Sequence, residues 1–205
     1  MIVGEIADST SVSLDYSIFR AVNGFAGRNA ALDAVMIGSA KYLPLVFAAA
    51  LVGLWITWRL RNQRVAFLAG ASVMIALGFG QIIGKVLPRP RPYLSHAVTQ
   101  LIPRSLDTSF PSDHAILGFA VAVMLWKFNR PLGFVMVGLA ILMAFARVFV
   151  GAHYPGDVLG GAILGAGTSA ALEWVSGRKP LEPMLNAFFR LLGRLHFASS
   201  ARDSG

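Results

Sequence analysis

Five long apolar runs, separated by short polar segments, occupy most of the chain between residues 42 and 175. A helix needs about 20 mostly apolar residues to cross the roughly 30 Å hydrocarbon core of a bilayer. The runs come close to this length: Tyr42–Trp58, Val65–Leu87, Asp113–Phe128, Pro131–Val150 and Pro155–Val175. The first is expected to begin earlier, near Leu32, and to form a long, tilted helix. The pattern predicts an all-α integral membrane protein, built as a bundle of five transmembrane helices.

Both ends of the chain mix apolar with polar or basic side chains. Near the amino terminus, apolar residues recur at helical spacing beside Arg20 and Asn23: Ile18, Phe19, Val22 and Phe25. This spacing predicts an amphipathic helix on the membrane surface, or a sixth spanning helix if the segment crosses the bilayer. Residues 181–205 are expected to form a basic amphipathic segment followed by a disordered tail. Residues 1–180 are then a single membrane-embedded domain.

The composition excludes several classes of protein. Hydrophobic residues make up 56% of the 205 residues and charged residues 14%, which is too apolar for an ordinary soluble domain. The absence of cysteine excludes disulfides, a thiolate nucleophile and cysteine-ligated zinc. A net charge of +8 would suit a nucleic-acid partner if it lay on one face. The charge is instead divided between the two sides of the predicted membrane, so we expect membrane lipids and no nucleic acid as partners.

The basic residues predict how the bundle is oriented. Ten of them follow the first, third and fifth spans: Arg59, Arg61, Arg64, Lys127, Arg130, Arg178, Lys179, Arg190, Arg194 and Arg202. Because Lys and Arg accumulate in cytoplasmic loops, these segments are expected inside the cell. Five other cations lie on the opposite face and need another explanation: Lys85, Arg89, Arg91, Arg104 and Arg147.

Most of these remaining cations belong to three short segments at the ends of the apolar runs: GKVLPRPRP (84–92), SFPSDHA (109–115) and RVFVGAHYPGDVLGG (147–161). Ionisable groups beside a bilayer are costly and usually functional. The three segments resemble, in order, the three signature motifs of the type 2 phosphatidic acid phosphatase superfamily, the membrane relatives of vanadium haloperoxidases. The third motif matches most fully, through Arg147, His153 and Asp157.

The other two motifs depart from the usual pattern. In the second, Pro111, Ser112 and His114 match, while Asp113 stands where many members have glycine. A Ser-Asp-His version is typical of the bacterial undecaprenyl-diphosphate phosphatase branch, the bacitracin-resistance type. In the first, Arg91 matches, but the position seven residues earlier, usually lysine, is glycine, and Lys85 comes one place later. The resemblance extends from about residue 17 to about residue 175.

The resemblance implies an enzyme of the bacterial cytoplasmic membrane, with its site facing the non-cytoplasmic side. It would hydrolyse undecaprenyl diphosphate to undecaprenyl phosphate and inorganic phosphate, and so recycle the lipid carrier of cell-wall synthesis. A histidine of the third motif would carry the phosphoryl group as a phosphohistidine. Neither a metal nor another cofactor is expected, because carboxylates are sparse and both motif histidines have better roles than ligation.

Side-chain chemistry suggests a role for each motif residue. His153 is the expected nucleophile, and Asp157, four residues later, would hold its far ring nitrogen and fix its tautomer. His114 would donate a proton to the leaving oxygen, and Ser112 would hydrogen bond to phosphate. The expected phosphate-binding cations are Arg91 and Arg147, with Arg89 or Lys85 as a third. Asp113 could interact with the positive end of its helix, tune His114 or tune the binding of a second phosphate. His96 is a further candidate for substrate contact.

Other functions fit parts of the same pattern. The motifs recognise only the phosphoryl group, so a phosphatidylglycerophosphate or phosphatidic acid phosphatase is an alternative within the same enzyme class. A small membrane transporter would also place charged residues at helix ends. Release of phosphate by the purified protein would separate catalysis from transport.

Overall fold

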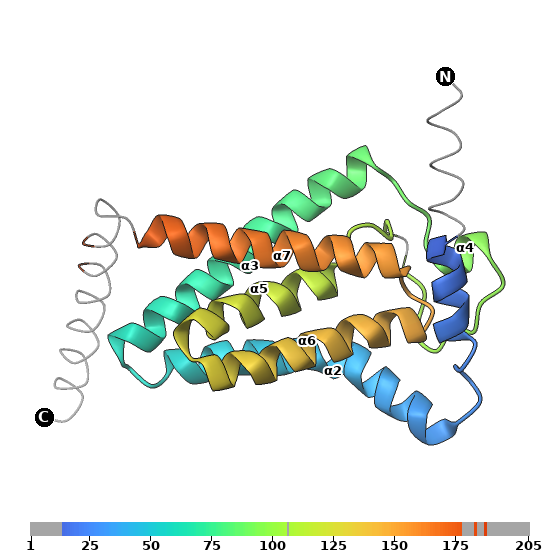
Figure 1. The fold of residues 1–205 in the computed structure, drawn as a ribbon, viewed down its shortest axis with the longest axis horizontal. Helices are drawn as coiled ribbons and strands as arrows, with labels where there is room; N and C mark the ends of the chain where they lie inside the picture. The colour runs from blue at the N-terminus through green and yellow to red at the C-terminus, as the bar shows by residue number, and fades with distance from the viewer. Residues whose placement is uncertain (1–13, 106, 178–182, 184–186, 188–205) are drawn as a thin grey trace, which may run out of the picture.

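The computed structural model describes residues 14–105, 107–177, 183 and 187. All regular structure in these residues is helical, as the apolar pattern predicted (Figure 1). A helix over residues 14–23 precedes six helices, which we label α2 (Ala30–Trp55), α3 (Leu60–Val86), α4 (Pro92–Ser95), α5 (Asp113–Phe128), α6 (Arg130–Phe149) and α7 (Pro155–Ser176). The predicted amphipathic helix between Leu181 and Phe197 lies outside the described residues, apart from the isolated positions 183 and 187.

Four of these helices, α2, α3, α6 and α7, are long and apolar enough to cross a membrane. The fold class is therefore confirmed, but the predicted number of five or six spanning helices is not. The remaining predicted span, Asp113–Phe128, corresponds to α5, which has only 16 residues and is about 24 Å long at 1.5 Å per residue. It begins after Ser112 and ends at Asn129, whose side chain accepts the Leu132 N–H at the start of α6.

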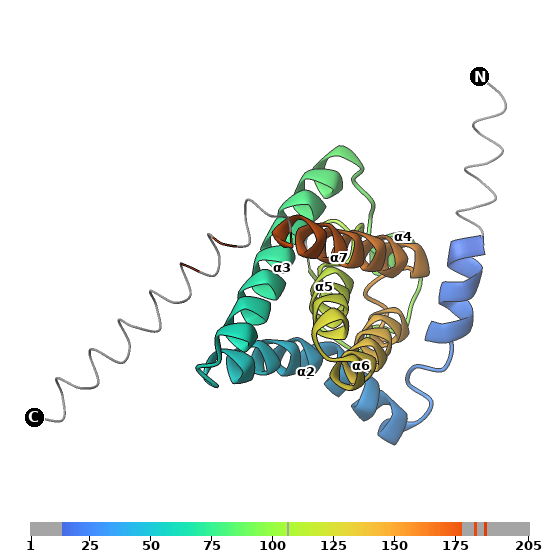
Figure 2. The ribbon, with the colours of Figure 1, turned by 60° about the vertical axis from the view of Figure 1, so that its left-hand side comes forward.

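Helix α5 lies at the centre of the bundle and packs against α3, α6 and α7 (Figure 2). Two glycines let α7 approach it closely. A Cβ atom at Gly161 would overlap the carbonyl oxygen of Ser112, and one at Gly165 would overlap that of Ile116. Small residues at helix contacts favour such packing within membranes. This contact holds the start of α5 beside the start of α7, which brings the second and third motif segments together.

The helix over residues 14–23 packs across the end of the bundle where α5 and α7 begin (Figure 1). Its Phe19 is 1% exposed and its ring meets that of Tyr154 edge to face, with 5.4 Å between centroids. The buried Asn23 donates from Nδ2 to the backbone oxygens of Thr99 and Phe149, at 2.8 Å each. Of the four apolar residues that predicted this amphipathic helix, Phe19 is therefore buried where the helix closes this end of the bundle and Val22 is partly buried, whereas Ile18 and Phe25 are exposed.

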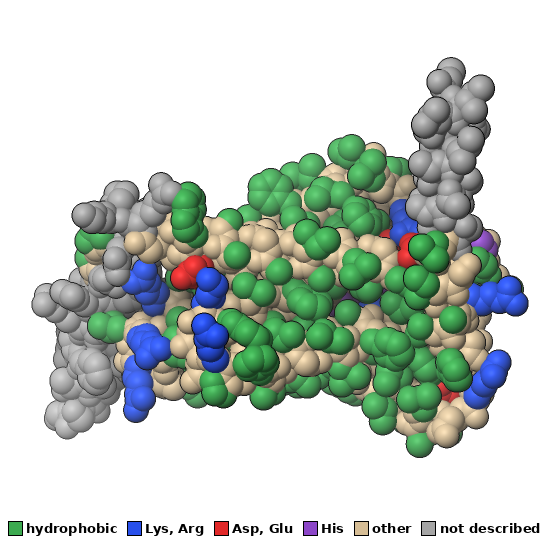
Figure 3. All heavy atoms as spheres, in the orientation of Figure 1, with side chains coloured by type: hydrophobic (Ala, Val, Ile, Leu, Met, Phe, Trp, Pro, Cys, Tyr) green, Lys and Arg blue, Asp and Glu red, His purple; other side chains and the backbone are tan. Residues whose placement is uncertain are grey.

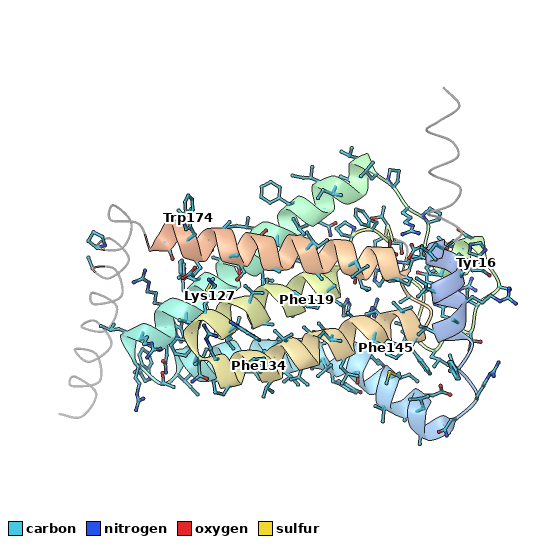
Figure 4. All side chains as sticks on the ribbon, viewed as in Figure 1. Tyr16, Phe119, Lys127, Phe134, Phe145 and Trp174 are labelled. Atoms are coloured by element: carbon cyan, nitrogen blue, oxygen red, sulfur yellow. The ribbon has the colours of Figure 1, made fainter. Side chains whose placement is uncertain are left out.

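The opposite end carries the basic loops that the sequence assigns to the cytoplasm. Lys and Arg side chains gather there in Figure 3, and Lys127 and Trp174 lie there in Figure 4, far from Tyr16 at the motif end. Arg61 donates to the Phe128 carbonyl at the end of α5, and Arg64 to the Ser176 carbonyl at the end of α7, both at 3.0 Å. Cations at helix carboxyl ends satisfy free carbonyls and oppose the helix dipole. These arginines therefore also have a structural role beyond orientation.

Candidate active site

The three motif segments meet around one cavity of about 120 Å³ at the end of the bundle where α5 and α7 begin. The first motif contributes Arg91, the second Asp113 and His114, and the third Arg147 and His153. The other lining residues come from α3 and from the loop before α5: Gly80, Gln81, Ser105, Asp107, Thr108, Phe110 and Pro111. Residues separated by more than 60 positions in the sequence thus share one polar cavity.

His153 lies in the turn between α6 and α7 and is only 2% exposed. Its Nδ1 lies 2.9 Å from the backbone oxygen of Ser109. Because a carbonyl can only accept, Nδ1 carries the proton and Nε2 keeps its lone pair. Nε2 in turn faces two donors, Nη1 of Arg91 at 3.2 Å and Nη2 of Arg147 at 3.4 Å. The unprotonated nitrogen is therefore the one beside the cations.

The same surroundings keep His153 neutral. Burial lowers its pKa to about 4, and the charges of Arg147 and Arg91 act in the same direction, against the opposing effect of Asp157. The unperturbed value of histidine is about 6.5. At neutral pH the imidazole is thus unprotonated at Nε2 and available as a nucleophile.

Asp157 is completely buried behind the histidine, but it does not form the hydrogen bond that we predicted. Its Oδ2 lies 3.8 Å from Nδ1 of His153, and that nitrogen bonds to Ser109 instead. The carboxylate accepts from the Ser109 hydroxyl, from the Tyr154 N–H at 2.8 Å and from Nη1 of Arg89 at 2.7 Å. Asp157 thus anchors the residues around the histidine and places a negative charge near the ring.

The two arginines predicted to bind phosphate differ in how their donors are used. Arg91, which is 4% exposed, donates to the backbone and carboxylate oxygens of Asp107 and to the Ala152 carbonyl, at 3.0–3.2 Å. Within residues 14–105 and 107–177, the buried Nε of Arg147 has no hydrogen-bond partner. A buried donor without a partner is costly. Arg147 is thus prepared to receive an anion, whereas Asp107 holds Arg91 beside His153.

Asp107 was not recognised from the sequence. It lies in the loop before α5, lines the cavity and pairs with Arg91 at 3.0 Å. Burial raises its pKa, but the hydrogen bond from Ser105 and the charge of Arg91 outweigh that effect and lower the pKa overall. Its carboxylate is therefore charged at neutral pH and occupies donors that an anionic ligand would compete for.

The second motif contributes three neighbouring residues in different ways. His114 lines the cavity together with His153, as an acid for the leaving oxygen must. Asp113 also lines it, and accepts long hydrogen bonds of 3.3 and 3.4 Å from Gln81. The N–H of Ser112 donates to the Asp157 backbone oxygen at 3.0 Å, so this donor is not available to phosphate.

Besides Ser112 and Asp157, three further candidate residues do not line the cavity. Lys85 is exposed, while Gly84 faces the loop before α5, because one helical position turns a side chain by about 100°. Arg89 is bound to Asp157 and to Asp15, and these carboxylates outweigh burial and raise its pKa further. His96 stacks on the Tyr16 ring, with 3.8 Å between centroids. The expected third phosphate-binding cation is thus absent from the residues that line this cavity.

The PAP2 superfamily profile matches residues 65–180, which is more than half of the chain. The chain belongs to the PAP2 superfamily. Among its relatives is the undecaprenyl-diphosphatase BcrC of Bacillus subtilis, which is 33% identical over 151 residues, 74% of this chain and 78% of the relative. The putative undecaprenyl-diphosphatase YbjG of Escherichia coli is 29% identical over 184 residues, 87% of this chain and 92% of the relative.

A solved structure shares the fold. The crystal structure of LpxE from Aquifex aeolicus superposes with a TM-score of 0.69, covers 78% of this chain and 95% of its own, and has 24% sequence identity. The profile match and the relative from Bacillus subtilis show that the protein is a membrane-embedded phosphatase of the PAP2 superfamily. The predicted nucleophile His153, the two arginines predicted to bind phosphate and His114 lie around one cavity.

Proposed function

We propose that the protein hydrolyses undecaprenyl diphosphate to undecaprenyl phosphate and inorganic phosphate. The main support is the position of Nε2 of His153, whose lone pair lies between the guanidinium groups of two buried arginines. The names of two relatives also support this substrate: the undecaprenyl-diphosphatase of Bacillus subtilis and the putative undecaprenyl-diphosphatase of Escherichia coli. The cavity of about 120 Å³ can hold a phosphoryl group but not a long prenyl chain, so the tail must lie outside it.

The first step of the proposed mechanism transfers the terminal phosphoryl group to the enzyme. Nε2 of His153 attacks the terminal phosphorus, a P–N bond forms, and the P–O bond to the bridging oxygen breaks. His114 donates a proton to that oxygen, and undecaprenyl phosphate leaves. Arg147 and Arg91 stabilise the charge on the non-bridging oxygens.

The second step hydrolyses the phosphohistidine. His114, now without its proton, accepts one from a water molecule, whose oxygen attacks phosphorus. The P–N bond breaks, the electron pair returns to Nε2 of His153, and inorganic phosphate is released. Because Nδ1 remains bonded to the Ser109 carbonyl throughout, the ring enters the next cycle in the same tautomer.

The proposed orientation places the cavity at the outer face of a bacterial cytoplasmic membrane. Lys127, which Figure 4 labels, and Arg61, which donates to the Phe128 carbonyl at the end of α5, lie at the opposite end of the bundle from the cavity. Basic residues accumulate on the cytoplasmic side, so this supports the arrangement. Undecaprenyl diphosphate released at the outer face would then reach the site without crossing the membrane.

The experiment that tests this function measures phosphate release by purified protein in detergent. Undecaprenyl diphosphate, phosphatidylglycerophosphate and phosphatidic acid are compared as substrates, with chelator present. We expect the highest kcat/KM for undecaprenyl diphosphate and no turnover by His153→Ala. A higher kcat/KM for either phospholipid would reject the proposed substrate, and turnover by His153→Ala at the wild-type rate would reject the nucleophile.

A further inference from the structure

We propose that Asp15, in the amino-terminal helix and outside all three motifs, is a positioning residue for the phosphatase site. Its carboxylate holds Arg89 against the buried Asp157 and also binds the first turn of α7. The inference rests on the proposed roles of His153 and Asp157, which it extends to a segment with no motif of its own.

The contacts of Asp15 connect two elements of the site. Its Oδ2 lies 2.6 Å from Nη2 of Arg89, and its Oδ1 accepts the backbone N–H of Gly156 at 2.8 Å. The side chain is 16% exposed, so water screens this pair only partly. Gly156 is the second residue of α7, where a carboxylate satisfies a free N–H and suits the positive end of the helix dipole. One carboxylate thus joins the start of α7 to the segment that carries Arg89.

Arg89 transmits this contact to Asp157. Its Nη1 lies 2.7 Å from Oδ1 of Asp157, and its guanidinium lies over the Tyr154 ring at 4.2 Å from the centroid. The other oxygen of Asp157, Oδ2, accepts from Tyr154 N and from the Ser109 hydroxyl and is the oxygen nearest His153. Each oxygen of the Asp157 carboxylate therefore has its own partners. The contact with Arg89 fixes the rotation of this carboxylate, so that Oδ2 points toward the His153 imidazole.

The charges of the three residues explain why a second carboxylate is useful. Arg89 paired with Asp157 alone would form a neutral pair behind the histidine. With Asp15 included, two carboxylates share one guanidinium, and the cluster keeps a formal charge of −1. Positive charge develops on the imidazole as Nε2 attacks phosphorus, and a net negative cluster behind the ring stabilises it. Neutralising Asp15 should therefore slow phosphoryl transfer without weakening the binding of substrate, since Asp15 does not line the cavity.

The helix that carries Asp15 is held firmly enough to position it. Phe19 is buried against Tyr154, and Tyr16 stacks on the His96 ring. Asn23 donates to the Phe149 carbonyl at the end of α6, at 2.8 Å. The helix thus contacts the segments before α5 and α7, and Figure 4 shows Tyr16 at this end of the molecule. Its packing gives Asp15 a defined place relative to Arg89.

The test compares Asp15→Asn with Asp33→Asn, a matched control at the start of α2. Asp33 accepts the N–H of Gly27 at 3.1 Å and is not part of the Arg89 cluster. Both variants are assayed in detergent on whichever lipid phosphate the wild-type protein hydrolyses fastest, with melting temperature as a measure of folding. A failure of the undecaprenyl diphosphate assignment therefore leaves this test intact.

For Asp15→Asn we expect kcat to fall about ten- to a hundredfold, as when a supporting partner of a reactive group is removed, with KM unchanged. Asp15→Glu should recover most of the loss, and Asp33→Asn should keep wild-type kinetics. A kcat within twofold of the wild type, a change confined to KM, or an equal loss in Asp33→Asn would overturn the proposal. Should Asp15→Asn not fold, Asp15→Ser, which can still accept the Gly156 N–H, takes its place with the same expected kcat. If neither variant folds, Asp15 is a folding residue and the proposal is wrong.

Discussion

Replacing Asp157 with asparagine separates two explanations of how this carboxylate serves the nucleophile. If the carboxylate fixed the tautomer of His153, its loss would cost roughly ten-thousandfold in rate, as for the orienting carboxylate of a serine protease. The structure instead assigns the tautomer to the Ser109 carbonyl, 2.9 Å from Nδ1. Asp157→Asn should then leave the tautomer intact and remove only the negative charge.

The size of the charge effect follows from the geometry. Oδ2 of Asp157 lies 3.8 Å from Nδ1, and unit charges at that separation interact by roughly 4 kcal/mol at an effective dielectric constant of about 20. Arg89, 2.7 Å from the other oxygen, offsets part of this attraction. We therefore expect a net loss of about 3 kcal/mol, which corresponds to about a hundredfold in the rate of phosphoryl transfer.

The assay is the rate of phosphohistidine formation in a single turnover, together with steady-state kcat, on protein shown to be monodisperse. Ser109→Ala is the matched control, because it removes the hydroxyl that binds Asp157 but keeps the backbone carbonyl that binds Nδ1. We expect this control to lose no more than about tenfold. If Asp157→Asn lowers the rate of phosphohistidine formation about ten-thousandfold, the carboxylate and not the Ser109 carbonyl fixes the tautomer. If the rate falls less than tenfold, Asp157 is a structural residue only.

Three further predictions concern the cations, the pH dependence and the topology. Arg91→Ala should lower kcat/KM by at least about a hundredfold. Lys85 is exposed, so Lys85→Ala should change kcat/KM by less than about twofold. Equal losses in the two variants would contradict the observed placement of these side chains. On the acidic side of the profile, and after correction for ionisation of the substrate, kcat/KM should fall as the pH drops toward about 4, where His153 gains a proton at Nε2. An acidic limb at 6.5 or above would be inconsistent with this. The protein has no cysteine of its own, so single cysteines can be labelled in intact spheroplasts that express it. Thr99→Cys should react with an impermeant thiol reagent, and Asn62→Cys should react only after lysis. The reverse pattern would place the site on the cytoplasmic side.

The amino-acid sequence alone determined the class of the fold and singled out the candidate histidines and arginines of the site. Apolar runs of membrane-spanning length can form only helices in lipid, because each backbone polar group must find a partner within its own segment. Ionisable side chains are too costly in that setting to occur without a role, so the motifs were visible as exceptions to an apolar pattern. Arg91, Arg147, His114 and His153 were identified in this way, and the structure brings all four to one cavity.

The tertiary structure decided which polar atoms meet, since this depends on helix rotation and on loop paths that no local pattern encodes. Lys85 and Arg89 were both plausible phosphate ligands by type and spacing, but helix rotation exposes the first and two carboxylates hold the second. The sequence spacing predicted that Asp157 would bind Nδ1 of His153, but the Ser109 carbonyl is the atom within hydrogen-bond distance of that nitrogen. A pattern of side chains cannot predict this contact, because it says nothing about the positions of backbone oxygens. The contact of Asp15 with Arg89 joins residues 74 positions apart. Such a contact exists only because the amino-terminal helix folds across the end of the bundle.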